Sequence, residues 1–115
     1  MKIRRNNKYH AVKVEYQGMT FDSHRELIRW QELCLAQKIG RISSLERQVK
    51  FELIPALKGE RAVSYYADFT YFNNENGKKI VEDVKSPITA KEKSYVIKRK
   101  LLKWRYPDIV FIEIF

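Results

Sequence analysis

The sequence contains only one cysteine, Cys34, among its 115 residues. A single cysteine excludes a disulfide bond within the chain and a metal site built from several cysteines. No apolar stretch approaches the roughly 20 residues that a membrane-spanning helix needs, and no signal peptide is recognisable. We therefore expect a protein of the reducing cytoplasm that does not enter a membrane, with Cys34 as a small apolar core residue on a helix.

Acidic residues are outnumbered: 14 Asp and Glu stand against 23 Lys and Arg, which gives a net charge of +9. This excess suits a polyanionic partner such as nucleic acid or an acidic membrane surface, although a basic domain without such a partner is the plainer alternative. Hydrophobic residues make up 44%, which excludes a disordered chain. We expect a flexible basic arm at residues 1–8 ("MKIRRNNK") and a single domain at residues 9–115.

Glycine and proline are also few, and most of them lie where a helix or strand is expected to end. Periodicity, caps and turn signals predict the following order: a hairpin at 9–21, a helix at 22–40, strands at 45–55, 63–72 and 78–85, a helix at 89–106 and a strand at 109–115. The last strand is apolar on both faces, as in the interior of a mixed sheet. The predicted fold class is α/β, with an α-β-β-β-α-β core, a mixed sheet and two flanking helices.

Two adjacent acids interrupt the strand "IVEDVKS" at residues 80–86. Because side chains alternate along a strand, Asp83 and Lys85 share one face, and Glu82 points to the other. Asp68 lies on the preceding strand. A four-residue loop between the strands would place Asp68 opposite Asp83, whereas a two-residue turn would place it opposite Lys85. Both registers bring Asp68, Asp83 and Lys85 to one face of the sheet.

Two neighbouring carboxylates repel each other unless a positive charge lies between them. Mg²⁺ is suited to this position, because it takes one or two carboxylates, keeps several waters and accepts phosphate oxygens. Lys85 could then orient a water or neutralise charge on a phosphate. The alternative is a metal-free, salt-bridged strand face formed by Asp68, Lys85 and Asp83.

The first helix contributes a third acid. Helical spacing places Glu26 on the apolar stripe with Cys34, facing the sheet, and places Arg29 on the opposite side. An inward carboxylate is unfavourable unless a partner satisfies it. Ser23 and Glu26 have the spacing of a capping box, and this structural role can coexist with a functional one.

The second helix carries a basic cluster. Lys98 is expected on the inward face, where it either extends its ammonium to solvent or reaches a bound phosphate. Arg99 and Lys100 belong to a group that could contact a DNA backbone, although a solvated helix face is the commoner meaning of such a pattern. Thr89 and Glu92 have the spacing of a second capping box.

These residues together resemble the PD-(D/E)XK nuclease superfamily. The likeness is carried by Glu26 on a first helix, Asp68 in "YYADF", the "EDVK" segment and the basic helix, and it covers the chain from Phe21 onward. It is strongest to small phage-type members, similar to phage endonuclease I and related junction resolvases. Ala67 stands where the family name has proline before the first aspartate.

The resemblance implies a restriction-endonuclease-like core and a set of functional residues. Asp68, Asp83 and the Val84 carbonyl would bind Mg²⁺, for which Mn²⁺ would substitute, and Glu26 would complete the acid set. Lys85 would position or activate the water. Apart from the resemblance, the charge pattern leads us to expect that basic residues of the arm and of the second helix, Lys98 among them, hold the DNA backbone.

The expected function is a Mg²⁺-dependent DNA endonuclease that hydrolyses phosphodiester bonds and recognises DNA structure, such as a Holliday junction, rather than base sequence. A symmetric junction resolver needs two active sites, which would require a homodimer. The alternative is a non-catalytic DNA-binding or assembly protein on a nuclease-like fold.

Overall fold

The computed structural model describes residues 2–5 and 12–115, with side chains from residue 12 onward. The elements are β1 (Lys2–Arg5), β2 (Val12–Tyr16), β3 (Met19–Phe21), α1 (His24–Lys38), β4 (Ile42–Ile54), β5 (Val63–Asn73), β6 (Lys79–Val84), a 3₁₀ turn (Thr89–Lys91), α2 (Lys93–Arg105) and β7 (Val110–Ile114). Apart from β1, the order is a hairpin followed by α-β-β-β-α-β, as predicted. No helix among the described residues is long and apolar enough to cross a membrane.

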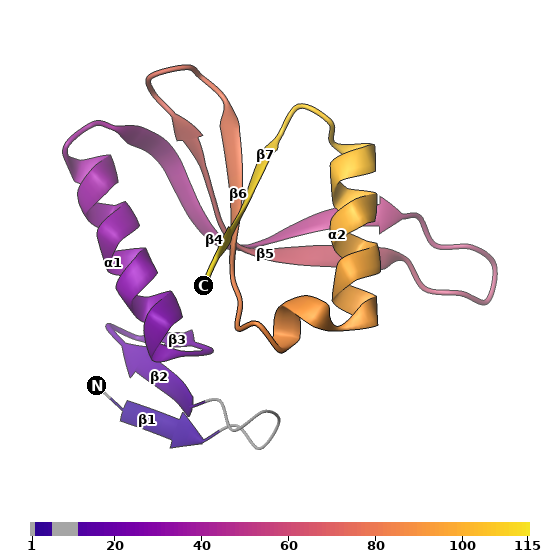
Figure 1. Ribbon diagram of the computed structural model, residues 1–115, viewed down its shortest axis with the longest axis horizontal. Helices are drawn as coiled ribbons and strands as arrows, with labels where there is room; N and C mark the ends of the chain where they lie inside the picture. The colour runs from indigo at the N-terminus through magenta and orange to yellow at the C-terminus, as the bar shows by residue number, and fades with distance from the viewer. Residues whose placement is uncertain (1, 6–11) are drawn as a thin grey trace.

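The main sheet has the strand order β4-β5-β6-β7. The first two pairings are antiparallel, and β6 pairs with β7 in parallel, so the sheet is mixed. Leu33 of α1 packs with Ile80, whereas Leu102 of α2 packs with Val81. Because Ile80 and Val81 are neighbours on β6, the two helices cover opposite faces of the sheet (Figure 1). The predicted α/β class, with a mixed sheet and two flanking helices, is confirmed at this level.

The ribbon formed by β4 and β5 changes direction near its middle (Figure 1). Ala67 packs in the apolar cluster under α2, and Phe69, two residues later, packs in the cluster under α1. Side chains from one side of β5 therefore pack against α2 before this point and against α1 after it. The turn coincides with Gln48 on β4, whose φ of 54° lies in the left-handed region. Strands bend where their backbone leaves the extended conformation, so the bend brings the middle of the ribbon close to both helices.

The N-terminal hairpin forms as predicted and packs against α1. Its turn residues Gln17 and Gly18 both have positive φ, as a two-residue turn of the right twist requires. Val14 and Phe21 bury their side chains against Leu27 of α1. The hairpin therefore supports the start of α1, the part of the helix that carries Glu26.

The flexible arm expected at residues 1–8 is corrected in part. Lys2–Arg5 form strand β1, which pairs antiparallel with β2 and makes the small sheet three-stranded. Residue 1 and residues 6–8 lie outside the described residues.

Three local expectations are wrong. Strand β7 lies at the edge of the sheet rather than inside it, and all of its residues are half-buried. Cys34 is exposed and does not belong to the core. Helix α2 begins at Lys93, after a 3₁₀ turn, and Glu92 makes no side-chain cap. Thr89 bonds to Ser86 instead, so the second capping box does not form.

Candidate functional site

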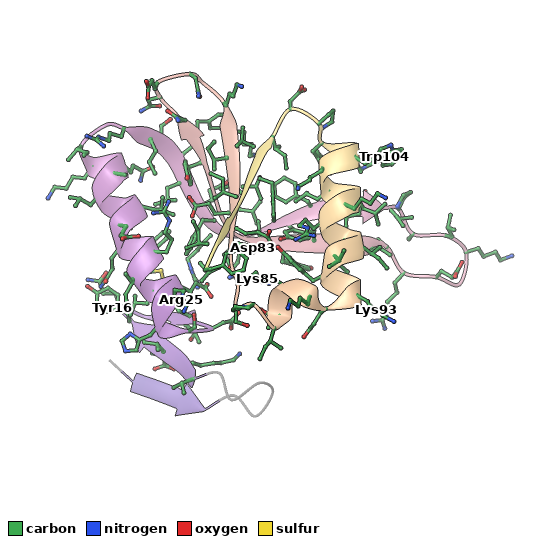
Figure 2. The ribbon with its side chains drawn as sticks, in the orientation of Figure 1. Tyr16, Arg25, Asp83, Lys85, Lys93 and Trp104 are labelled. Atoms are coloured by element: carbon green, nitrogen blue, oxygen red, sulfur yellow. The ribbon has the colours of Figure 1, made fainter. Side chains whose placement is uncertain are left out.

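Asp68 and Asp83 face each other across two hydrogen-bonded strands. Phe69 pairs with Glu82, which places Asp68 opposite Asp83. This is the register with a four-residue loop at residues 74–77, the first of the two predicted alternatives. Figure 2 shows Asp83 and Lys85 near the centre of the molecule, between the two helices.

Each of the two carboxylates reaches across to the backbone of the other strand. Asp83 Oδ1 accepts a hydrogen bond from the Asp68 N–H at 3.2 Å, and Asp68 Oδ2 accepts one from the Val84 N–H at 2.8 Å. Asp83 is only 1% exposed, and its Oδ2 is buried without a hydrogen-bond partner. The two acids are therefore fixed in place, and one carboxylate oxygen is left unsatisfied beside them.

Burial makes both acids reluctant to ionise. It raises the pKa of Asp83 to about 6, and the positive charge of Lys85 opposes this shift. Burial also raises the pKa of Asp68, against the Val84 N–H and Lys85. The Lys85 ammonium lies over the Tyr95 ring, 4.7 Å from its centroid. One lysine does not offset the burial of two carboxylates, which leaves a site where an additional cation would be stabilising.

Glu26 is buried at the first turn of α1, with 2% of its surface exposed. Its N–H donates to Ser23 Oγ at 3.1 Å, which is the predicted cap. The return bond of a capping box goes elsewhere, because Glu26 Oε2 accepts from the Asp22 N–H at 3.2 Å. Burial, followed by the charges of Asp68 and Asp22, raises the pKa of Glu26 to about 8. Arg47 Nη2 lies 4.0 Å from Glu26 Oε1, and its positive charge acts in the opposite direction on this pKa.

Gln48 joins Glu26 to Asp68, and sequence reasoning did not find this role. Its Nε2 donates to Glu26 Oε1 at 3.2 Å and to Asp68 Oδ1 at 3.4 Å. The alternation of β4 correctly places Gln48 on the polar side of the strand, which was the available signal. The left-handed backbone that directs its amide between the two acids is not visible in the sequence. Strained residues of this kind cluster at functional sites.

Asp68 and Asp83 have the donor chemistry that a Mg²⁺ ion accepts. In the described ranges 2–5 and 12–115, no group of three or more His, Cys, Asp or Glu is placed to hold a metal ion. Mg²⁺ needs fewer protein ligands, because it keeps several waters. Asp68 and Asp83 would supply oxygen ligands, and the ion would give the unpartnered Asp83 Oδ2 a partner. The Val84 peptide lies beside them. Glu26 contacts Asp68 through Gln48, which places it one residue further away.

Glu82, next to Asp83 in the chain, lies on the other face in a different environment. Arg29 donates from Nε to Oε1 and from Nη2 to Oε2, both at 2.7 Å, and the Tyr71 hydroxyl donates to Oε2. Arg29 was expected to face away from the sheet and instead forms this buried ion pair. Glu82 is therefore fully satisfied and unavailable to a ligand.

A cleft of about 190 Å³ opens beside Asp83. Its lining residues come from β5, from β6 and the residue after it, and from α2: Ser64, Tyr65, Tyr66, Asp83, Lys85, Ser94, Tyr95 and Lys98. Lys98, predicted to face inward, thus lines the same cleft as Asp83. A larger hollow of about 800 Å³ lies between α1 and the sheet, but none of the predicted site residues lines it.

The other two predicted substrate-binding residues differ from each other. Arg99 was expected on the outer face of its helix, but its Nη1 donates to Glu113 Oε2 at 3.0 Å, and the residue is half-buried. Lys100 is exposed, as expected. The guanidinium of Arg99 is therefore already paired with Glu113. The positive charges of Lys98 and Lys100 are more accessible to a negatively charged ligand.

Comparison with known protein families gives one match. A family model described as "Protein of unknown function (DUF1064)" matches residues 6–114, which is nearly the whole chain. No curated protein matches the sequence.

Proposed function

Because the chain belongs to the DUF1064 family, whose function is unknown, we propose its function from its site: a metal-dependent endonuclease that hydrolyses DNA phosphodiester bonds. The observation that carries the proposal is a pair of acids, half-buried Asp68 and buried Asp83, fixed on adjacent strands with one oxygen unsatisfied and Lys85 alongside. The α-β-β-β-α-β order of the elements and the mixed sheet are consistent with a restriction-endonuclease-like core.

In this proposal the chain positions a phosphate between oppositely charged groups. Asp68, Asp83 and the Val84 carbonyl would hold Mg²⁺, which when bound supplies charge neutralisation at phosphate and a more acidic water. Lys85 donates hydrogen bonds to the water or to a phosphate oxygen, and its place over Tyr95 limits its motion. Glu26 is linked to Asp68 through the Gln48 amide and would complete the acid set from that position.

The excess of basic residues supports DNA as the substrate. A net charge of +9 favours a polyanion, and binding through phosphates should weaken steeply as salt rises. We expect recognition of DNA structure rather than base sequence, with branched junctions as the first substrates to test. Cutting a junction symmetrically would require a homodimer, so that two sites act on one substrate.

Cleavage assays on a supercoiled plasmid and a synthetic four-way junction test the proposal. We expect cleavage by the wild type with Mg²⁺ or Mn²⁺ and none with EDTA. Asp83→Asn and Lys85→Ala should each reduce the rate at least about 100-fold, because each removes charge stabilisation at the reacting phosphate. Asp108→Asn is the matched control: Asp108 is exposed and lies outside the site, so cleavage should be unchanged.

Two results would contradict the proposal. Cleavage that survives both Asp83→Asn and Lys85→Ala would show that these residues are not the active site. Metal-independent DNA binding with no cleavage of either substrate would favour a non-catalytic DNA-binding protein.

A further inference from the structure

The cleft beside Asp83 contains more hydrogen-bonding groups than the proposed cleavage site uses. Tyr65 lines it and is only 4% exposed, yet its hydroxyl is buried without a hydrogen-bond partner. Asp83 also lines this cleft, but its unpartnered Oδ2 can only accept hydrogen bonds and is assigned to the proposed metal site, so it does not indicate an anion. Buried polar atoms without partners are rare in folded proteins and usually mark a bound water, ion or ligand.

The remaining lining groups indicate what kind of ligand fits. Lys85 and Lys98 bring two ammonium groups, and Ser64 and Ser94 bring two hydroxyls in addition to that of Tyr65. All five can donate hydrogen bonds, and two are positively charged. Such a set suits an anion with several oxygens, and phosphate is the anion of this kind that nucleic acids carry.

We propose that this cleft is a second phosphate pocket, which binds a phosphate of the DNA strand next to the one that is cleaved. The inference rests on the proposed function for the identity of the ligand. The size agrees: about 190 Å³ is below the ~300–1,000 Å³ of sites for whole organic ligands and suits a phosphate with part of its sugar. Asp83 borders the pocket and the cleavage site alike, so neighbouring phosphates of one strand would occupy the two.

Titration of inorganic phosphate into the ¹⁵N-labelled, full-length protein in EDTA, followed by NMR, tests the pocket directly. We expect saturable shifts of the backbone amides of Ser64, Tyr65 and Ser94. Lys98→Gln should weaken phosphate binding about tenfold, and Tyr65→Phe about fivefold, since each removes one donor. Asp83→Asn should strengthen binding, because it removes a negative charge from the edge of the pocket.

Lys103→Gln is the matched control for Lys98→Gln. Both remove one positive charge from α2, but Lys103 is exposed and does not line the cleft. Its effect on phosphate binding should stay below about twofold. Equal effects of the two variants, or shifts spread over the basic surface without saturation, would overturn the proposal. Lys98 is only half-buried, so this pair remains informative if Tyr65→Phe folds poorly.

Short oligonucleotides then identify the source of the phosphate. If a strand end occupies the pocket, Lys98→Gln should weaken binding of a 5′-phosphorylated strand more than that of its 5′-hydroxyl form. If an internal phosphate occupies the pocket, Lys98→Gln should weaken binding of both strands equally, and Lys103→Gln should weaken neither to the same degree. Either pattern supports the pocket. If the protein binds phosphate in this cleft but never cleaves DNA, the pocket is supported and the proposed nuclease activity is contradicted. If it cleaves DNA but does not bind phosphate, the nuclease activity is supported and the pocket is contradicted.

Discussion

Glu82 and Asp83 are adjacent in β6 and equally buried, yet their hydrogen bonding differs. Glu82 has two hydrogen bonds from Arg29 and a third from Tyr71. Asp83 has one hydrogen bond from a backbone N–H, and its second oxygen has no partner. Full satisfaction is typical of a group that holds a fold together, and incomplete satisfaction is typical of a group that waits for a ligand. One strand thus carries a structural acid on one face and a candidate functional acid on the other.

The largest expected effect on stability comes from removing the charge of Glu82. Glu82→Gln leaves the Arg29 guanidinium partly buried beside a neutral group, and loss of one partner of a buried pair costs about 3 kcal/mol. Urea unfolding measures this loss. Glu32→Gln is the control, because exposed Glu32 contacts the same arginine at 3.2 Å and should cost no more than ~0.5 kcal/mol. Similar losses in the two variants would mean that Glu82 is not a structural anchor.

Ionised Asp83, unlike Glu82, should destabilise the folded protein, so its contribution to the free energy of unfolding should fall as pH rises. Its pKa is raised to about 6, so the folded protein binds this proton more tightly than the unfolded chain. That contribution is complete below about pH 4 and is lost as pH rises through 6, a change of roughly 1–3 kcal/mol. Asp83→Asn should remove this part of the pH dependence and be no less stable than the wild type at pH 7.5.

Urea unfolding at pH 4.5 and 7.5 makes the measurement for Asp83→Asn. Asp108→Asn, at an exposed position, should retain the pH dependence of the wild type. If Asp83→Asn destabilises the protein at pH 7.5 as strongly as Glu82→Gln, the two acids are both structural and the contrast between the faces fails.

The smallest expected effect is stabilisation by Mg²⁺. With about 10 mM Mg²⁺ and a dissociation constant of about 1 mM, binding to the folded state adds about 1.4 kcal/mol. A thermal shift assay should show this gain in the wild type and its loss in Asp83→Asn. Glu32→Gln keeps both site acids and should gain as much stability from Mg²⁺ as the wild type. Equal stabilisation of the wild type and Asp83→Asn would place the ion elsewhere.

The opposite directions of Glu82 and Asp83 were predictable from sequence, because they follow from the period of two in a strand. The register of the β5–β6 hairpin was narrowed to two alternatives that share the same face for Asp68 and Asp83. The inward position of Glu26 followed in the same way from the period of a helix. Such features depend only on local geometry, which a sequence determines well.

The contacts that depend on long side chains were harder to predict. Arg29 lies three residues after Glu26, about 60° around the helix, so it borders the inward face, and its length lets it reach Glu82. Arg99 reaches Glu113 on β7 in a similar way. Helical spacing gives the direction of the Cβ atom, and an arginine places its charge several bonds beyond that point.

The position of β7 could not be read from its own composition. Its apolar residues are half-buried because helices cover both faces of the sheet, and that covering does not require a strand on each side. Strand order depends on the pairing of distant segments, which the hydrophobicity of a single strand does not encode.

The bend at Gln48 has a consequence for how this site can change during evolution. Glycine adopts a positive φ with less strain than glutamine, so backbone energy alone favours glycine at this position. Glycine has no side-chain amide to donate hydrogen bonds to Glu26 and Asp68. Low backbone strain therefore favours glycine at this position, and the hydrogen bonds to Glu26 and Asp68 favour glutamine. The residue found here in a relative would show which of the two requirements was retained.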